Sequence, residues 1–270
     1  MVSPLRVFVG TAANHEDAES QAVLEHSIRS RTMSDVEITW MRLSKDPGSP
    51  FYSDRERRLG WDTTTWATPF TGFRWAVPSL AGFTGRALYM DSDMIVLADL
   101  AELFSQQVHP GCIALTKTPN RSCVMLFDCV EAQSKLPHVE DLMRSIATVK
   151  TNARTMMAPF INGNWNCLDG EKHGSIYDPE IKILHYTSMP HQPHLPRALE
   201  RLAQRGHKHW FDGSVTTHWR KDVVDLFERE FSAAVAAGYT VDRYEQDPPF
   251  GPYAKRPLTH LRGKKPGWSA

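Results

Sequence analysis

The chain has 270 residues, of which 41% are hydrophobic and 23% are charged, and its 31 basic residues balance its 31 acidic residues. These values suit a globular protein with one large core and exclude a disordered acidic chain. Nucleic-acid-binding proteins usually carry a basic excess, so the neutral balance predicts no nucleic-acid partner.

The N-terminus, MVSPLRVFVG, lacks the basic segment and long apolar segment of a secretory signal. No stretch reaches the roughly 20 apolar residues of a membrane span. We therefore predict a cytoplasmic protein. In that reducing compartment, cysteines without zinc-site spacing are predicted to be buried free thiols. They are Cys112, Cys123, Cys129 and Cys167.

Predicted strands and helices alternate in the first half of the chain, where apolar residues change between strand and helix spacing. In chain order we predict a strand over 5–10, a helix over 16–30, a strand over 36–43, a loop over 45–70, and a helix over 70–83 that bends near Pro78. A third strand over 87–90 places Asp91 and Asp93 at its carboxyl end.

An apolar run over 94–97, a short helix over 98–104, and strands over 112–116 and 122–129 follow. This alternation predicts an α/β fold with a mainly parallel central sheet. In such sheets ligands bind beyond the carboxyl ends of the strands, which is where the two aspartates lie.

The second half has weaker periodicity. It contains a turn-like stretch over 161–170, a strand over 181–186, a proline-broken loop over 189–196, helices over 196–204 and 221–237, and a basic, proline-rich tail over 247–270. We predict a single domain over 1–246 followed by this tail. Within it, Trp165 is interpreted as a core residue, and His207-Lys208-His209 as a solvated turn.

Asp91 and Asp93 are two carboxylates held close together between apolar runs. Such groups repel unless a positive charge holds them or one is protonated. A divalent cation, Mn²⁺ or Mg²⁺, does this and leaves coordination positions for phosphate oxygens. The alternatives are a solvated acidic turn or a phosphatase with Asp91 as nucleophile, in which Ile95 stands where Thr or Val is typical.

Five blocks in the same order resemble glycosyltransferase family 8, of the glycogenin and bacterial lipopolysaccharide galactosyltransferase type, and within it a branch of small microbial members. The most specific block is FRWAVPSLAGFTGRALYMDSDMIVLADLAELF; the others are RVFVGT with VLEHSIRSR, SCVMLFDC, NWNCLD, and KILHYTSMPHQP. The resemblance implies the GT-A fold, a Rossmann-like nucleotide-diphospho-sugar transferase architecture, and retaining transfer from a UDP-sugar assisted by Mn²⁺.

The resemblance also assigns residues. It implies Asp91, Asp93 and His185 as metal ligands, and it implies catalytic roles for Asp91, Asp93 and Arg74, the arginine steadying the acidic pair and the donor phosphates. The implied donor-binding residues are Thr11, Arg74, Asp91, Ser122, Asn166 and Gln192.

Two stretches depart from the family pattern. Residues 120–123, Asn-Arg-Ser-Cys, replace the Asn-Ala-Gly or Asn-Ser-Gly that precedes the sugar-pocket strand, so the donor sugar is not identified. The lysine that follows the metal-binding histidine in many members is absent, which leaves Gln192 or a histidine to meet the diphosphate. These departures keep open an alternative, a non-catalytic nucleotide-sugar or glycan-binding protein on the same fold.

The acceptor is a hydroxyl of a glycan, a lipid-linked glycan or a small molecule, and the sequence selects neither among these nor an oligomeric state. The basic tail has two interpretations. It is either a solvated end or a segment that lies on anionic lipid, where clustered Lys and Arg side chains are attracted to the surface. The second interpretation predicts weak peripheral association with the inner membrane face.

Overall fold

The computed structural model describes residues 3–143, 153–171 and 175–253. In this part of the chain the central sheet has six strands in the order β2-β1-β5-β8-β7-β9. Strand β8 runs opposite to the other five, because it pairs antiparallel with β5 and β7 while the remaining pairs are parallel. The predicted, mainly parallel α/β sheet is therefore confirmed. Its strands are β1 (Leu5–Gly10), β2 (Val36–Met41), β5 (Arg86–Asp91), β7 (Ala114–Thr116), β8 (Val124–Asp128) and β9 (Met157–Pro159).

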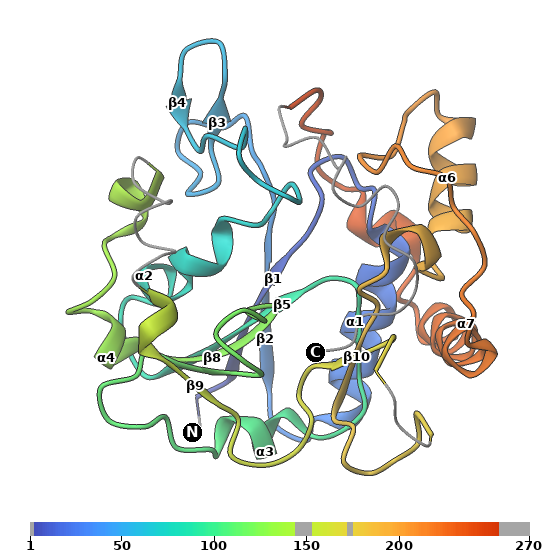
Figure 1. Cartoon of the computed structure of the whole chain (residues 1–270). Helices are drawn as coiled ribbons and strands as arrows, with labels where there is room; N and C mark the ends of the chain where they lie inside the picture. The colour runs from blue at the N-terminus through green and yellow to red at the C-terminus, as the bar shows by residue number, and fades with distance from the viewer. Residues whose placement is uncertain (1–2, 144–152, 172–174, 254–270) are drawn as a thin grey trace.

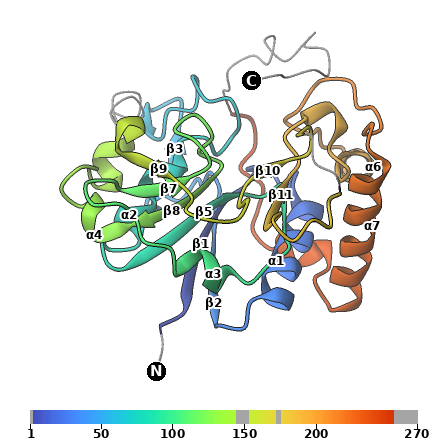
Figure 2. The same cartoon turned by 60° about the horizontal axis from the view of Figure 1, so that its bottom comes forward.

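Both faces of the central sheet are buried, because its strands are apolar at successive positions. Phe8, Tyr89 and Phe127 belong to one core cluster, and their sequence neighbours Val7 and Leu88 belong to another. Helix α1 (Ala18–Arg31) covers the second face, while α2 (Val77–Leu80) and α4 (Cys129–Ala132) cover the first. Figures 1 and 2 show these helices on opposite sides of the sheet.

A smaller sheet continues from the end of β5. Its order is β10-β11-β6, formed by β6 (Met94–Val96), β10 (Cys167–Leu168) and β11 (Ile183–His185). Helix α7 (Lys221–Ala236) packs against α1 and shares a core with this sheet through Ile95, Leu184 and Phe227. Helix α6 (Leu195–Gln204) lies on the same side of the molecule (Figure 1).

The remaining short elements are β3 (Ser53–Asp54), β4 (Leu59–Gly60), α3 (Leu100–Phe104), and the 3₁₀ turns η1 (Phe73–Ala76), η2 (Arg154–Met156), η3 (Met189–His191) and η4 (Val241–Tyr244). The predicted loop over 45–70 thus contains a short hairpin. The single bent helix over 70–83 is wrong. Pro78 stands in the first turn of α2, where its missing N–H is tolerated, so the segment is a 3₁₀ turn followed by a short helix.

All four cysteines are free, as predicted, but only Cys129 and Cys167 are buried; Cys112 and Cys123 are half-buried. Most of the predicted basic tail, residues 254–270, lies outside the described residues. Among the described residues, no helix is long and apolar enough to cross a membrane.

Gly10 ends β1 directly beside Asp91, with which it pairs across the parallel β1–β5 ladder. A Cβ at this position would lie 2.5 Å from the Tyr89 hydroxyl oxygen and 2.8 Å from Cδ2 of Phe70. The Tyr89 hydroxyl donates a hydrogen bond of 2.6 Å to Oδ1 of Asp91. The missing side chain of Gly10 therefore gives Tyr89 the room to reach the aspartate.

The start of α1 buries several carboxylates. Glu19 forms an ion pair with Arg201, whereas Glu16 accepts hydrogen bonds from the backbone and side-chain amides of Asn14. Burial and the neighbouring Asp17 carboxylate raise the pKa of Glu16 to about 7. Because no described residue forms an ion pair with Glu16 to offset its burial, this carboxyl is protonated more readily in the folded chain than in the unfolded chain.

We predict that Gly10→Ala destabilises the fold by about 1–3 kcal/mol, because the added methyl group overlaps two buried aromatic side chains. Urea unfolding of the variant and the wild type measures the difference. Gly48→Ala is the matched control, since the nearest atom to its added Cβ is Oδ1 of Asp46 at 3.4 Å. Equal unfolding free energies for Gly10→Ala and the wild type would contradict the packing argument.

We predict that Glu16→Gln stabilises the protein at about pH 8 and has little effect at about pH 5. The raised pKa means that the folded chain binds more protons than the unfolded chain between the two pKa values. Stability is therefore greatest at low pH and is lost as the pH rises through about 7. The shift corresponds to a loss of up to about 3 kcal/mol, which glutamine does not suffer. Chemical unfolding at both pH values tests this, with exposed Glu56→Gln as control. A pH-independent effect of Glu16→Gln is the contrary outcome.

Candidate functional site

The two aspartates lie where the large sheet gives way to the small one. Asp91 is the last residue of β5, and Asp93 lies in the turn before β6. The backbone N–H of Asp91 donates to the carbonyl of Cys123, and that of Ser92 donates to the carbonyl of Gly10, each at 3.1 Å. The turn is thus fixed to both β1 and β8, at the carboxyl end of β5 that the sequence indicates.

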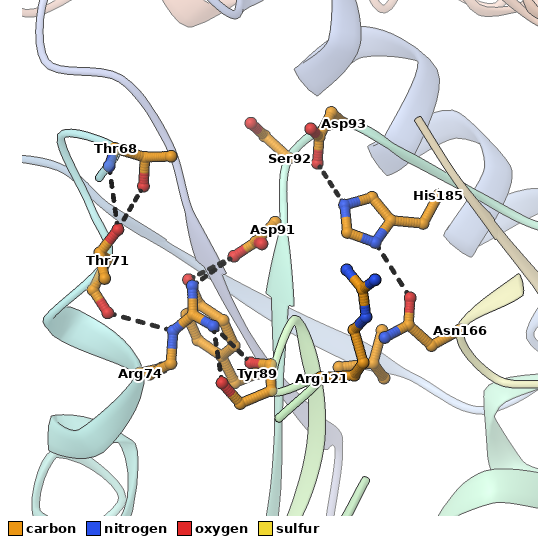
Figure 3. Close-up of polar contacts among 12 residues, drawn as sticks. Thr68, Thr71, Arg74, Tyr89, Asp91, Ser92, Asp93, Arg121, Asn166 and His185 are labelled. Atoms are coloured by element: carbon orange, nitrogen blue, oxygen red, sulfur yellow. Dashed lines mark hydrogen bonds and ion pairs between the residues drawn. The ribbon is translucent and has the colours of Figure 1, made fainter. Parts of the chain in front are cut away.

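Arg74 anchors the first aspartate from the 3₁₀ turn η1. Its Nη2 lies 3.3 Å from Oδ1 of Asp91, and its Nη1 donates to the carbonyl and hydroxyl oxygens of Ser122 at 2.7 and 2.9 Å. Its Nε donates to the carbonyl of Thr71, and its guanidinium lies over the ring of Tyr89 (Figure 3). The predicted contact between Arg74 and the acidic pair is present, and Ser122 contacts Arg74 directly.

The acidic pair is electrostatically strained in the protein alone. Burial raises the pKa of Asp91, the Arg74 guanidinium opposes this shift, and the nearby Asp93 carboxylate adds to it. Burial disfavours the charge of Arg74, but Tyr89 and Asp91 raise its pKa, so it remains a cation. One arginine does not balance two carboxylates, and the site has an affinity for further positive charge.

His185 reaches the second aspartate from the small sheet. The β11–β6 register places it opposite Met94, one residue after Asp93. Its Nε2 lies 3.3 Å from Oδ1 of Asp93, and its Nδ1 lies 3.0 Å from Oδ1 of Asn166 (Figure 3). Because the Asn166 oxygen accepts, Nδ1 carries the proton, and in the neutral imidazole Nε2 presents a lone pair toward Asp93.

The Asp93 carboxylate and the His185 imidazole are groups of the type that binds a divalent cation. Oδ1 of Asp93 is a buried carboxylate oxygen without a hydrogen-bond partner among the described residues. Burial lowers the pKa of His185, but the Asp93 and Asp91 carboxylates outweigh it and the net shift is upward. In the protein alone this favours an imidazolium as the counter-charge. A bound cation would replace that proton, with carboxylate oxygens and a neutral imidazole as ligands.

Cys123 is a neighbour that the sequence did not reveal. One potential ligand atom each from Asp91, Cys123 and His185 lie within 4.8 Å of one another. Burial and the nearby Asp91 carboxylate raise the pKa of the Cys123 thiol, so it is protonated in the protein alone. The only signal in the sequence is the departure of residues 120–123 from the family pattern.

The other predicted donor-binding residues gather around the same turn. Nε2 of Gln192 donates to Oδ2 of Asp93 and to the carbonyl of Tyr186. Thr11 is one step further away, because its hydroxyl donates to Asp17 at 3.3 Å. Asp17 in turn accepts from the hydroxyl of Ser92 at 3.1 Å. The predicted site residues are therefore connected to the Asp91–Asp93 turn either directly or through one intermediate residue, which is Arg74 for Ser122, His185 for Asn166 and Asp17 for Thr11.

Asp17 and two histidines form a second polar group beside this turn. Asp17, His194 and His209 each place a potential ligand atom within 4.8 Å of the others, and all three are buried. The prediction of a solvated turn over residues 207–209 is therefore wrong for His209. Its Nδ1 accepts the backbone N–H of Phe211, so the neutral ring carries its proton on Nε2. That tautomer disfavours metal binding at Nε2 of His209. Trp165 is buried in the core, as predicted.

No protein-family model matches the chain. Protein CDI of Arabidopsis thaliana is 27% identical over 217 residues, a match that covers 68% of this chain and 78% of that protein. An active-site mutant of LgtC superposes with a TM-score of 0.50 at 12% identity, covering 86% of this chain and 96% of that one. The glycosyltransferase GlyE of Streptococcus pneumoniae TIGR4 superposes with a TM-score of 0.50 at 15% identity, covering 92% of this chain.

The chain spans 66% of the GlyE chain and about half, 52%, of the WbbM bifunctional glycosyltransferase. At these low identities the likeness concerns the fold. The chain therefore has the GT-A fold, the fold of glycosyltransferases.

Proposed function

We propose that the protein is a metal-dependent glycosyltransferase that moves a sugar from a UDP-sugar to a hydroxyl group of an acceptor. The proposed sugar is a hexose. The observation that carries the proposal is the contact between Asp93 and His185, 3.3 Å apart, beside the buried Asp91 at the carboxyl end of β5, in a chain with the GT-A fold. Ligands of α/β sheets bind at such ends. Membership of glycosyltransferase family 8 is part of the same proposal.

In this proposal Asp91, Asp93 and His185 would hold one Mn²⁺ or Mg²⁺. When bound, the ion supplies Lewis-acid stabilisation of the negative charge that grows on the leaving diphosphate, which is worth several kcal/mol. The surrounding residues prepare the ligands. Asn166 fixes the histidine tautomer and Gln192 orients the Asp93 carboxylate.

The reaction that fits the resemblance retains the configuration of the sugar. The bond between the anomeric carbon and the diphosphate oxygen breaks, and a bond to the acceptor oxygen forms on the same face. The acceptor proton passes to the leaving phosphate oxygen. Arg74 supports this step by keeping Asp91 in place, and its positive charge stabilises negative charge on the leaving group.

The acceptor is proposed to be a glycan, a lipid-linked glycan or a small molecule. Contact of the basic tail with the inner membrane face of the cell stays a prediction, because residues 254–270 lie outside the described part of the chain. The alternative on the same fold is a protein that binds a nucleotide sugar or glycan without turnover. The experiments below separate the two.

We predict that UDP raises the melting temperature only when Mn²⁺ is present, and that GDP, ADP and CDP have smaller effects. A ligand that binds only the folded state stabilises it by about 2.7 kcal/mol at a concentration of 100 Kd. Thermal unfolding with each nucleotide, with and without Mn²⁺ and with Mn²⁺ plus chelator, measures this. A larger shift with GDP would indicate a GDP-sugar as the donor. No shift with any nucleotide would overturn the proposed function.

We predict that Asp93→Ala reduces kcat/KM for UDP-sugar turnover by about 100-fold or more, because the variant loses several kcal/mol of metal-dependent stabilisation. Release of UDP from UDP-sugar without added acceptor is the assay, and Mn²⁺ titration calorimetry is the second readout. Exposed Asp62→Asn is the control. Normal turnover by folded Asp93→Ala refutes the metal role, whereas tight UDP-sugar binding by the wild type without turnover supports the non-catalytic alternative.

A further inference from the structure

Arg121 belongs to the segment that departs from the family pattern, and its backbone is held in a tight turn. Its N–H donates to the carbonyl of Thr118 at 2.8 Å, and its own carbonyl accepts the hydroxyl of Thr116 at 2.6 Å. The two residues that follow line the site, since Ser122 accepts from Arg74 and Cys123 lies beside Asp91. The turn therefore fixes the position of the Arg121 backbone beside the site.

The side chain of Arg121 extends into the site. Figure 3 shows its guanidinium pointing toward the space between Asp91 and His185. Within residues 3–143, 153–171 and 175–253, no hydrogen bond or ion pair holds this guanidinium. The residue is half-buried. By contrast, the nearby Lys117 is occupied by Glu171 and by the carbonyl of Asn166.

A charge count shows what this arginine could balance. The two charges of a divalent cation would neutralise Asp91 and Asp93. The diphosphate of a nucleotide sugar brings two negative charges, of which Arg74 balances one. The remaining negative charge needs one more cation. Arg121 is positioned to supply it, and its planar guanidinium suits bidentate contact with phosphate oxygens.

We propose that Arg121 binds the donor diphosphate, a role for which the loop after His185 offers no lysine. This inference rests on the proposed function, and it names the residue that meets the phosphates. Because no side chain in the described part of the protein holds the guanidinium, it can turn onto the phosphates when the donor binds. An alternative target of the same cation is the carboxylate of an acidic donor sugar, which the experiment distinguishes.

The test is calorimetric binding of uridine, UMP, UDP, UDP-glucose and UDP-glucuronate in the presence of Mn²⁺ by the wild type, Arg121→Gln and Arg121→Lys. We expect Arg121→Gln to weaken UDP binding roughly 10- to 100-fold, the usual value of hydrogen bonds to a charged group. Uridine affinity should not change, because uridine has no phosphate. Arg121→Lys should keep part of the UDP affinity, since it retains the charge without the planar fork.

The control is Arg229→Gln on the outer face of α7, which removes the same charge away from the site. UDP affinity equal to that of the wild type in Arg121→Gln overturns the inference and leaves the proposed function in place. Loss of affinity for UDP-glucuronate alone, with UDP and UDP-glucose unaffected, also overturns it and assigns Arg121 to an acidic sugar. If the wild type itself does not bind UDP with Mn²⁺, the proposed function fails and the inference fails with it.

Discussion

The buried contact between Arg74 and Asp91 is the interaction on which the rest of the site depends. Through its guanidinium, Arg74 joins the end of β5 to the 3₁₀ turn before α2 and to the segment that leads into β8. Removing one member of a buried pair typically costs about 3–5 kcal/mol, because the other charge is left without compensation. Separating these three segments would therefore cost several kcal/mol of folding free energy.

The second half of the site comes from a different sheet. His185 is carried by β11, and its contact with Asp93 follows from the antiparallel β6–β11 register. Asn166 precedes β10 and fixes the orientation of the imidazole. The large sheet thus supplies Asp91, which Arg74 contacts from η1, and the small sheet supplies His185, which Asn166 contacts from the segment before β10. The turn of residues 91–93 joins β5 of the large sheet to β6 of the small sheet.

The charged residues around the turn of residues 91–93 lie at different distances from its two carboxylates. Arg74 and His185 lie against the carboxylates, and Arg121 lies further out with its guanidinium directed inward. On the other side, Asp17 ties Ser92 to the start of α1 and lies beside His194 and His209. The same turn is therefore supported from β1, β8, α1 and β11, which limits the movement of its carboxylates when a charged ligand enters.

The sequence alone determined the parts of the protein that depend on neighbouring residues. Local hydrophobic spacing predicts the strand over 5–10, the helix that follows it and the position of Asp91 at the end of a strand. This spacing depends on neighbouring residues and not on how the strands pair. Arg74, His185 and Gln192 were reached only through a resemblance of motifs. Tertiary structure decided the split of the segment over 70–83, the burial of His209, and the roles of Cys123 and Asp17. Those outcomes arise from contacts between residues far apart in the chain, and hydrophobic spacing specifies which face of a strand or helix is buried without specifying which polar groups meet there.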